Sequence, residues 1–433
     1  MLHQRGAGVL MHISSLPSPY GIGVFDRHAR DFIDRIADMG FTYWQVLPLG
    51  PTSYGDSPYQ SFSAFAGNPY FIDLDTLAEE GLLTREEIDA CYWGDDVTQV
   101  AYDTVFWYRF PLLKKAHARS EFHEEEGYEK FCMESWYWLN DYALYMALKF
   151  HFDNQEWLAW PEDIRFRKRD AVERYKEELK EEIDFWKFLQ YKFFQQWKKL
   201  RAYANSQGIS IIGDIPIYVA LDSADVWNHP ELFLLDEESL TPLKVAGVPP
   251  DAFSETGQLW GNPLYRWDVQ EKTDFAWWKE RMKASGRLYD VVRIDHFIGV
   301  VQYYAIPAGA EDGRTGEWLK GPGKKLTDAI GQVIGDTKII AEDLGIFVPE
   351  VKALLEETGY PGMKIIEFAF SGDRFNEHLP HMYTPNSVVY GGTHDNETLV
   401  GYFKPEERQW WELQYIADYT GVSHQDQVVD RVM

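Results

Sequence analysis

The chain has 433 residues and a formal net charge of −27 at pH 7, and 45% of its residues are hydrophobic and 16% aromatic. This length suits two ordinary domains or one barrel of ~250 residues with insertions. The negative charge argues against nucleic acid or an anionic membrane as a partner, because phosphate-binding surfaces need clustered Lys and Arg. The two cysteines, Cys91 and Cys132, are too few for a disulfide framework, and no apolar run approaches the ~20 residues of a membrane span, so we expect a cytoplasmic protein.

Seven short apolar runs, bounded by Gly, Pro or polar residues, are typical of buried parallel strands. They lie at residues 8–14, 43–49, 209–217, 291–297, 338–344, 363–370 and 387–392. Helical patterns separate most of them, as at residues 26–39 and at residues 349–357, where Pro349 occupies the first turn. Strand and helix in alternation predict an α/β fold, specifically a (β/α)8 TIM barrel.

Two stretches are too long to be simple connections between strands. Residues 72–205 have a charged, aromatic-rich helical pattern, which predicts an inserted helical subdomain within one catalytic domain of residues 1–433; a separate domain is the alternative. Residues 218–290 are rich in turn residues and predict a loop-rich insertion over a cleft. A closed barrel needs eight strands, whereas seven are found here. Either one strand is not recognised in the sequence or the last strand and helix are missing from this chain, and we expect the second.

Three of the predicted strands end on acidic residues, namely Asp295, Glu342 and Asp395. In a parallel barrel the carboxyl ends of the strands meet at one mouth, where catalytic residues gather. Arg293 and Asp295 share one face of their strand because side chains alternate, and the Arg would keep the carboxylate ionised and oriented, as a nucleophile requires. The alternative is a buried Arg–Asp pair that braces the barrel.

The other two acidic strand ends also have more than one interpretation. Glu342 follows apolar residues that can raise its pKa, which suits a general acid at neutral pH. One of Glu342 and its neighbour Asp343 could instead cap the following loop, and Asp343 fits that role better. Asp395 lies in a Gly-rich polar turn that packing alone does not explain, and a metal site formed with His296 and His394 is a further alternative.

Three carboxylates in one pocket, one kept ionised and one kept protonated, fit a retaining glycosidase mechanism. The aromatic surplus agrees, because sugar rings stack on Trp and Tyr. Tyr59 and Trp260 lie in predicted Gly/Pro-rich loops, where they could bind sugar or simply stabilise the loops.

The chain resembles the 4-α-glucanotransferases of the amylomaltase type, glycoside hydrolase family 77. The matching segments are SSLPSPYGIG (14–23), WQVLPLGP (44–51), SPYQ (57–60), GDIPIY (213–218), AGVPPD (246–251), QLWGNP (258–263) and the acidic motifs RIDH (293–296), AEDL (341–344) and THDN (393–396). They extend over nearly the whole chain and are highly specific in combination.

The resemblance implies a role for each matching residue. Asp295 would be the nucleophile, Glu342 the general acid/base and Asp395 the stabiliser of the transition state. The donor sugar would be supported by Tyr59, Asp214, Arg293, His296 and His394. The family transfers α-1,4-glucan segments between maltooligosaccharides through a covalent glycosyl-enzyme, and it needs no cofactor or metal. The proline-containing loop at residues 247–253 could exclude water and so favour sugar acceptors.

Two rival interpretations follow from the same residues. An α-amylase-like hydrolase would use similar carboxylates, although such amylases carry an Asn-His pair where this chain has Ile-Pro after Asp214. A catalytically impaired glucan-binding protein is the second rival, because the early end of the chain could leave the barrel incomplete. Product analysis separates the three, since a transferase makes longer glucans, a hydrolase makes only shorter ones and a binding protein makes none.

Overall fold

The structure is a computed structural model that describes residues 5–251, 254–404, 408–422, 424 and 427–432. The chain divides into two compact units. The larger comprises Gly6–Val292 and Gly299–Thr337, and the smaller contains Arg293–Ile298 together with the described residues from Lys338 onward. None of the described helices is both long enough and apolar enough to cross a membrane.

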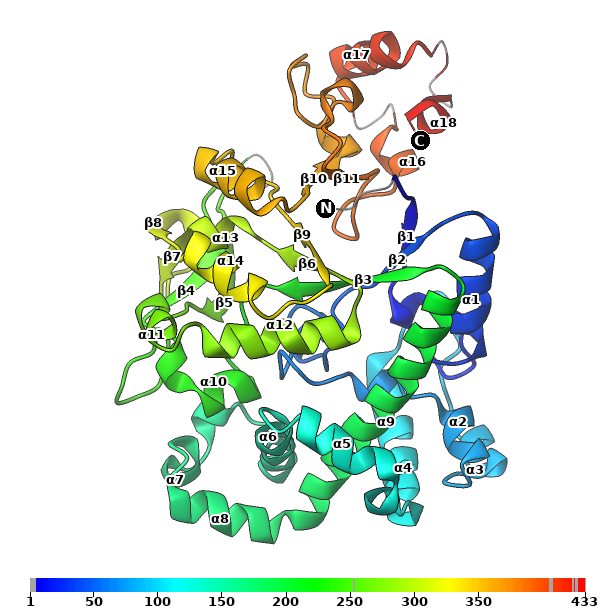
Figure 1. The fold of residues 1–433 in the computed structure, drawn as a ribbon, viewed down its shortest axis with the longest axis vertical. Helices are drawn as coiled ribbons and strands as arrows, with labels where there is room; N and C mark the ends of the chain where they lie inside the picture. Colours follow the sequence, from blue (N-terminus) through cyan, green and yellow to red (C-terminus); the bar gives the residue numbers. More distant parts are fainter. Residues whose placement is uncertain (1–4, 252–253, 405–407, 423, 425–426, 433) are drawn as a thin grey trace. The chain divides into compact units, whose positions relative to one another are not determined.

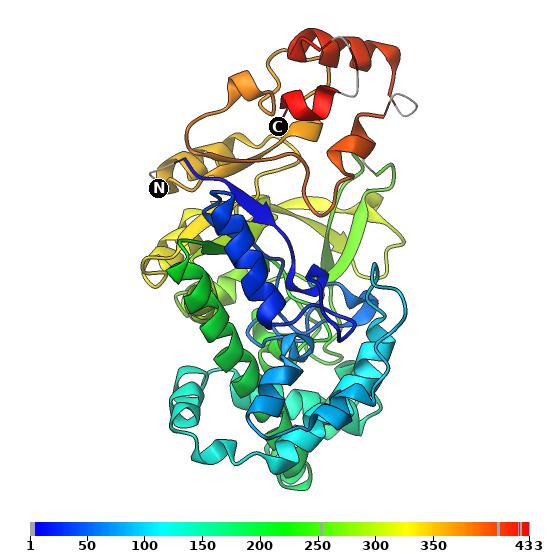
Figure 2. The same cartoon turned by 90° about the vertical axis from the view of Figure 1, so that its right-hand side faces the viewer.

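The larger unit contains a parallel sheet in which β1 (Gly8–Leu10), β2 (Tyr43–Gln45) and β3 (Ser210–Pro216) are neighbours (Figure 1). The start of β6 (Val291–Asp295) follows β3 in the strand order. Helix α1 (Arg27–Asp38) connects β1 and β2 along the chain and packs on the long helix α9 (Lys180–Ser206) (Figure 2). The hydroxyl of Tyr203 on α9 donates a hydrogen bond of 2.6 Å to Asp34 on α1. The predicted strands and helix in this part of the chain are confirmed.

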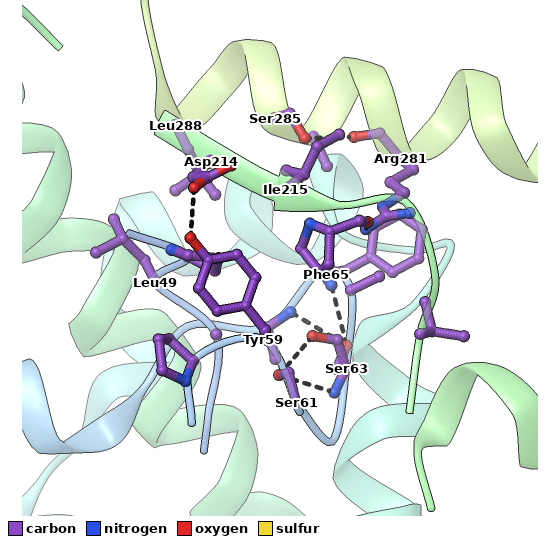
Figure 3. A pocket seen from close by; sticks show the side chains of 18 of the residues that line it. Leu49, Tyr59, Ser61, Ser63, Phe65, Asp214, Ile215, Arg281, Ser285 and Leu288 are labelled. Atoms are coloured by element: carbon purple, nitrogen blue, oxygen red, sulfur yellow. Dashed lines mark hydrogen bonds between the residues drawn. The ribbon is translucent and has the colours of Figure 1, made fainter. Parts of the chain in front are cut away.

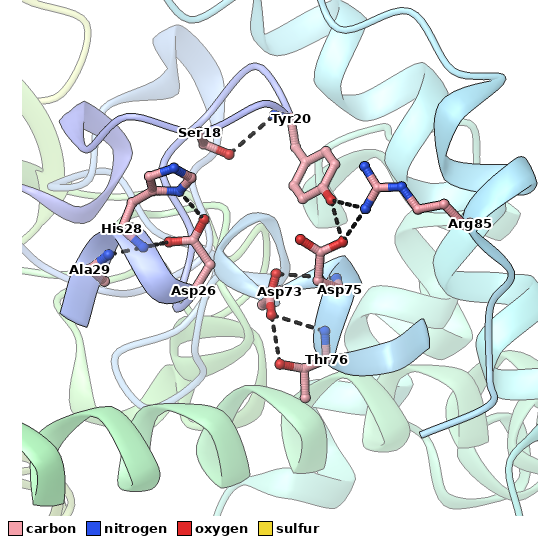
Figure 4. A network of polar contacts seen from close by, with 9 residues as sticks. All are labelled: Ser18, Tyr20, Asp26, His28, Ala29, Asp73, Asp75, Thr76 and Arg85. Carbon is pink, nitrogen blue, oxygen red and sulfur yellow. Dashed lines mark hydrogen bonds and ion pairs between the residues drawn. The ribbon is translucent and has the colours of Figure 1, made fainter. Parts of the chain in front are cut away.

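Carboxylate caps fix the helices that follow the first strands (Figure 4). Asp26 accepts the backbone N–H groups of His28 and Ala29 at the start of α1. In the same way Asp73 caps α2 (Leu74–Glu79). Such caps satisfy N–H groups that have no partner within the helix, and each contributes about 1 kcal/mol.

Residues 74–206 are mostly folded into helices (Figure 1). These are α2, α3 (Arg85–Asp89), α4 (Tyr102–Arg119), α5 (Glu126–Glu134), α6 (Leu139–His151), α7 (Glu162–Arg165), α8 (Arg169–Glu178) and α9. The helical character of this stretch matches the sequence-based expectation. The ammonium group of Lys149 on α6 lies 2.6 Å from Asp222, so it links α6 to the segment after β3. The same group donates to the carbonyls of Asn154 and Gln155, just after α6.

Replacing Lys149 by Met should strongly destabilise the protein. The Lys149 side chain is 1% exposed and that of Asp222 is 14% exposed, so the change leaves a largely enclosed carboxylate without its cation, which costs about 3–5 kcal/mol. The exposed pair of Lys168 with Glu162 provides the control, because Lys168→Met should cost less than about 1 kcal/mol. Urea unfolding of both variants measures the difference, and equal losses would contradict this assignment.

Residues 218–290 are more regular than the sequence suggested. They contain α10 (Ala224–Asn228), β4 (Lys244–Val248), β5 (Gln258–Pro263), α11 (Trp267–Lys272) and α12 (Ala276–Leu288). With β7 (Gln302–Pro307) and β8 (Glu317–Lys320), the strands form an antiparallel sheet in the order β5-β4-β7-β8. Helix α14 (Lys324–Gly331) follows, and residues 252 and 253 of the predicted water-excluding loop lie outside the described residues.

The smaller unit contains the end of β6 and three further predicted strands, all of which are confirmed. These are β9 (Lys338–Ala341), β10 (Gly362–Ile365) and β11 (Ser387–Tyr390), with β10 and β11 paired in parallel. Its helices are α15 (Pro349–Thr358), α16 (Leu399–Tyr402), α17 (Trp410–Thr420) and α18 (Val428–Val432), while α13 (Ile298–Val301) follows β6. An apolar cluster that includes Phe370, Leu379, Phe403 and Ile416 packs the last helices together.

Candidate active site

The first acidic strand end pairs with a buried arginine, as the alternation along β6 predicts. Arg293 Nη2 lies 2.9 Å from Asp295 Oδ1. The Arg293 side chain is 4% exposed, whereas that of Asp295 is 30% exposed. A buried guanidinium therefore stabilises the ionised form of a carboxylate that solvent, or a ligand, can still reach.

The second acidic strand end is tied directly to the first. Glu342 Oε2 accepts the backbone N–H of His296, the residue after Asp295, at 2.7 Å. Its backbone N–H donates to Ile294 O at 3.0 Å, so β6 and β9 are held side by side where both strands end. His296 adopts a left-handed backbone conformation with φ of 52°, which costs a non-Gly residue on the order of 1 kcal/mol.

Burial is the main influence on the acidity of Glu342. The residue is 7% exposed, and burial raises the pKa of its carboxyl group above the usual value. The positive charge of Arg293 and the N–H groups of Leu344 and His296 act in the opposite direction without cancelling the effect of burial. Glu342 is thus suited to hold its proton to a higher pH than an exposed glutamic acid would.

The neighbouring Asp343 serves a different purpose from the one expected of it. Asp343 Oδ1 accepts the N–H of Met363 at 2.7 Å and so binds the end of β9 to the start of β10. The turn after β9 is instead closed by Glu342, whose Oε1 accepts the N–H of Leu344 at 2.7 Å. The alternative that Asp343 caps this loop is therefore wrong.

The third acidic strand end lies in an open turn after β11. Asn396 Oδ1 closes this turn by accepting both the N–H and the hydroxyl of Thr393, each at 2.9 Å. The Asp395 side chain is 74% exposed and lies 3.2 Å from Nε2 of His394. Within the described part of the chain, no three His, Cys, Asp or Glu side chains are placed to hold a metal ion, so the alternative of a metal site gains no support.

A fourth acidic residue near a strand end was not predicted from the sequence. Glu367 lies two residues after the end of β10, in the short 3-10 helix Ile366–Phe368, and is 5% exposed. The rule that selected Asp295, Glu342 and Asp395 would have selected it as well, because it follows the apolar run Ile365-Ile366. It was missed because that strand was expected to continue to Phe370.

In the larger unit, two of the predicted sugar-binding residues are bonded to each other (Figure 3). The Tyr59 hydroxyl donates to Asp214 Oδ2 at 2.7 Å, from a loop onto strand β3. They line a cavity of about 50 Å³, which has room for about one or two water molecules. Buried Arg281 on α12 supports the end of β3 by donating to the carbonyls of Pro216 and Ile217.

Trp260 lies on strand β5 and not in a loop as expected. Its side chain is partly exposed, and its ring lies 6.3 Å from that of the buried Tyr218. Its indole N–H donates to Gln258 on the same strand at 3.0 Å. The ring is therefore held in place while part of it stays accessible, as a stacking surface for an apolar sugar face requires.

Comparison with known proteins gives consistent matches along the chain. Residues 11–433 match the family described as 4-alpha-glucanotransferase. A 4-alpha-glucanotransferase of Clostridium butyricum is 54% identical over 91% of this chain and 81% of its own length. One from Thermus thermophilus is 48% identical over 96% of this chain and 83% of its own length.

Solved structures show the same relationship. The amylomaltase of Streptococcus agalactiae, solved in complex with acarbose, superposes with a TM-score of 0.94 at 42% identity, over 99% of this chain and 87% of that one. The amylomaltase of Corynebacterium glutamicum, at 20% identity and a TM-score of 0.74, shares the fold over 99% of this chain and 59% of that one. The predicted α/β fold class is thus confirmed, while closure of the parallel strands into a barrel is not detected among the described residues, where they form the sheets β1-β2-β3-β6-β9 and β10-β11.

Proposed function

Because the chain belongs to the 4-alpha-glucanotransferase family, we propose that it transfers α-1,4-glucan segments from a donor to an acceptor maltooligosaccharide in the cytoplasm. One observation carries the proposal. The buried Glu342, whose pKa is raised by burial, accepts the N–H of the residue that follows Asp295, and Asp295 is paired with a buried arginine. A carboxyl group that holds its proton more tightly, next to a carboxylate paired with a cation, suits the acid/base and the nucleophile of a retaining glycosyl transfer.

In the first step, the Asp295 carboxylate attacks the anomeric carbon of the donor sugar. The bond to the glycosidic oxygen breaks, and Glu342 gives its proton to that oxygen, so that the shortened glucan leaves as a neutral alcohol. Arg293 orients the attacking carboxylate by its contact with Oδ1. The products of this step are a glycosyl ester on Asp295 and an ionised Glu342.

In the second step, the 4-hydroxyl of an acceptor glucan attacks the same carbon. Glu342, now a base, takes the hydroxyl proton while the ester bond to Asp295 breaks, which restores both groups and retains the α-configuration. Asp395 is exposed enough to grip sugar hydroxyls in the distorted transition state. Tyr59, Asp214, Trp260, His296 and His394 are the proposed sugar contacts.

Incubation with maltotriose tests this function. Transfer predicts a ladder of longer maltooligosaccharides together with glucose, because each donated segment must join another glucan. Formation of shorter sugars alone would indicate a hydrolase, with water as the acceptor. Binding of maltooligosaccharides without any turnover would indicate a glucan-binding protein, and either result would contradict the proposal.

A further inference from the structure

Glu367, the carboxylate that follows β10, has no part in the mechanism above. The residue is 5% exposed, and its Oε1 atom is fully enclosed without a hydrogen-bond partner among the described residues. Burying an ionised carboxylate without partners is costly, so such a group tends to be neutral or to serve a purpose that offsets the cost. Its surroundings indicate which purpose.

Glu367 supports the turn that carries Asp395. Its backbone N–H donates to Gly391 O at 3.2 Å. Its carboxyl oxygen Oε1 lies under Gly392, where an added Cβ atom would come within 2.8 Å of it. Thr393 follows at once and is bonded to Asn396, so the turn between Gly392 and Asp395 has little freedom to move independently of Glu367.

One of the charged groups that act on Glu367, the carboxylate of Glu397, lies just after the turn that carries Asp395. Burial and the negative charge of Glu397, two residues after Asp395, raise the pKa of Glu367 to about 7, against the opposing effect of Arg408. Tyr402 on α16 donates its hydroxyl to the Glu367 carbonyl. The carboxyl group is therefore neutral in mildly acidic solution. Above neutrality it becomes a buried anion that repels Glu397.

We propose that Glu367 is a positioning residue for Asp395. The neutral side chain of Glu367 lets the segment 391–397 pack on the end of β10, and ionisation of Glu367 displaces that segment and slows transfer. The inference rests on the proposed function, because it takes Asp395 to contact the reacting sugar. It adds a residue through which transfer responds to pH near neutrality, independently of the proton on Glu342.

The variant Glu367→Gln tests the proposal, since Gln has the same shape and cannot ionise. For the wild type, a single titration at about pH 7 predicts that kcat for maltotriose disproportionation falls about tenfold from pH 6 to pH 8. Glu367→Gln should keep most of its kcat at pH 6 and lose this fall. Glu397→Gln should move the fall to lower pH, because removing the like charge favours ionisation of Glu367.

Hydrogen exchange gives a second readout that does not depend on activity. At pH 8, peptides from residues 391–398 should exchange faster in the wild type than in Glu367→Gln, and at pH 6 the two should match. An unchanged pH profile together with equal exchange at pH 8 would overturn the proposal. Absence of transfer at every pH, with the exchange difference present, would overturn the proposed function but uphold the link between Glu367 and this segment.

Discussion

Asp295→Asn should lower kcat for maltotriose disproportionation by about 10⁴- to 10⁶-fold, the range found when a catalytic nucleophile is removed. The amide has the shape of the carboxylate but cannot form the glycosyl ester. Because the Asp295 side chain is 30% exposed, the fold should survive the change. Activity is measured by the release of glucose over time.

The matched control is Asp290→Asn, directly before the same strand. Asp290 pairs with Arg201 at 2.6 Å and accepts the N–H of Ile211 at 2.8 Å, contacts that serve the sheet and not the site. This variant should lower the unfolding temperature while keeping most of the transfer activity. Comparable losses of kcat in both variants would show that Asp295 acts through stability and not as a nucleophile.

Glu342→Gln should lower kcat with maltotriose by about 10²- to 10⁴-fold, the usual contribution of a general acid or base. The loss should depend on the leaving group. With α-maltosyl fluoride as donor, the first step needs no proton and should proceed, whereas the second step still lacks its base. Asp343→Asn is the control, because its amide oxygen can still accept the N–H of Met363.

The direction of the pKa shift in Glu342 also predicts a pH dependence. Burial raises its pKa, so the proton needed in the first step is held to a higher pH than an ordinary glutamic acid would hold it, and it is lost as the pH rises through the raised value. The wild type should therefore lose activity on the alkaline side. Glu342→Gln, assayed with the fluoride donor in the first step, should not show that part of the profile.

The local patterns that could be predicted from sequence were those set by neighbouring residues. The alternation of side chains along β6 placed Arg293 beside Asp295. The apolar runs located the seven described strands β1, β2, β3, β6, β9, β10 and β11. Contacts between distant residues could not be found in this way. The bond from Tyr59 to Asp214 spans 155 positions and was not predicted, since the family resemblance implied only that each residue contacts the sugar. The role of Asp343 depends on a strand 20 positions later.

The antiparallel sheet was missed for a similar reason. Strand β4 pairs with β7 across a long intervening segment. Strands of four to six residues with turn residues between them resemble loops in sequence. Glu367 was missed because β10 ends at Ile365, earlier than the apolar run suggests. Propensity locates strands better than their ends, and in this fold the ends carry the chemistry.

Mass spectrometry of Glu342→Gln incubated with α-maltosyl fluoride detects the covalent glycosyl-enzyme itself. We expect the protein to gain the mass of one maltosyl group and peptide analysis to place this group on Asp295. Attachment to any other residue, or release of fluoride without any increase in protein mass, would contradict the proposed mechanism.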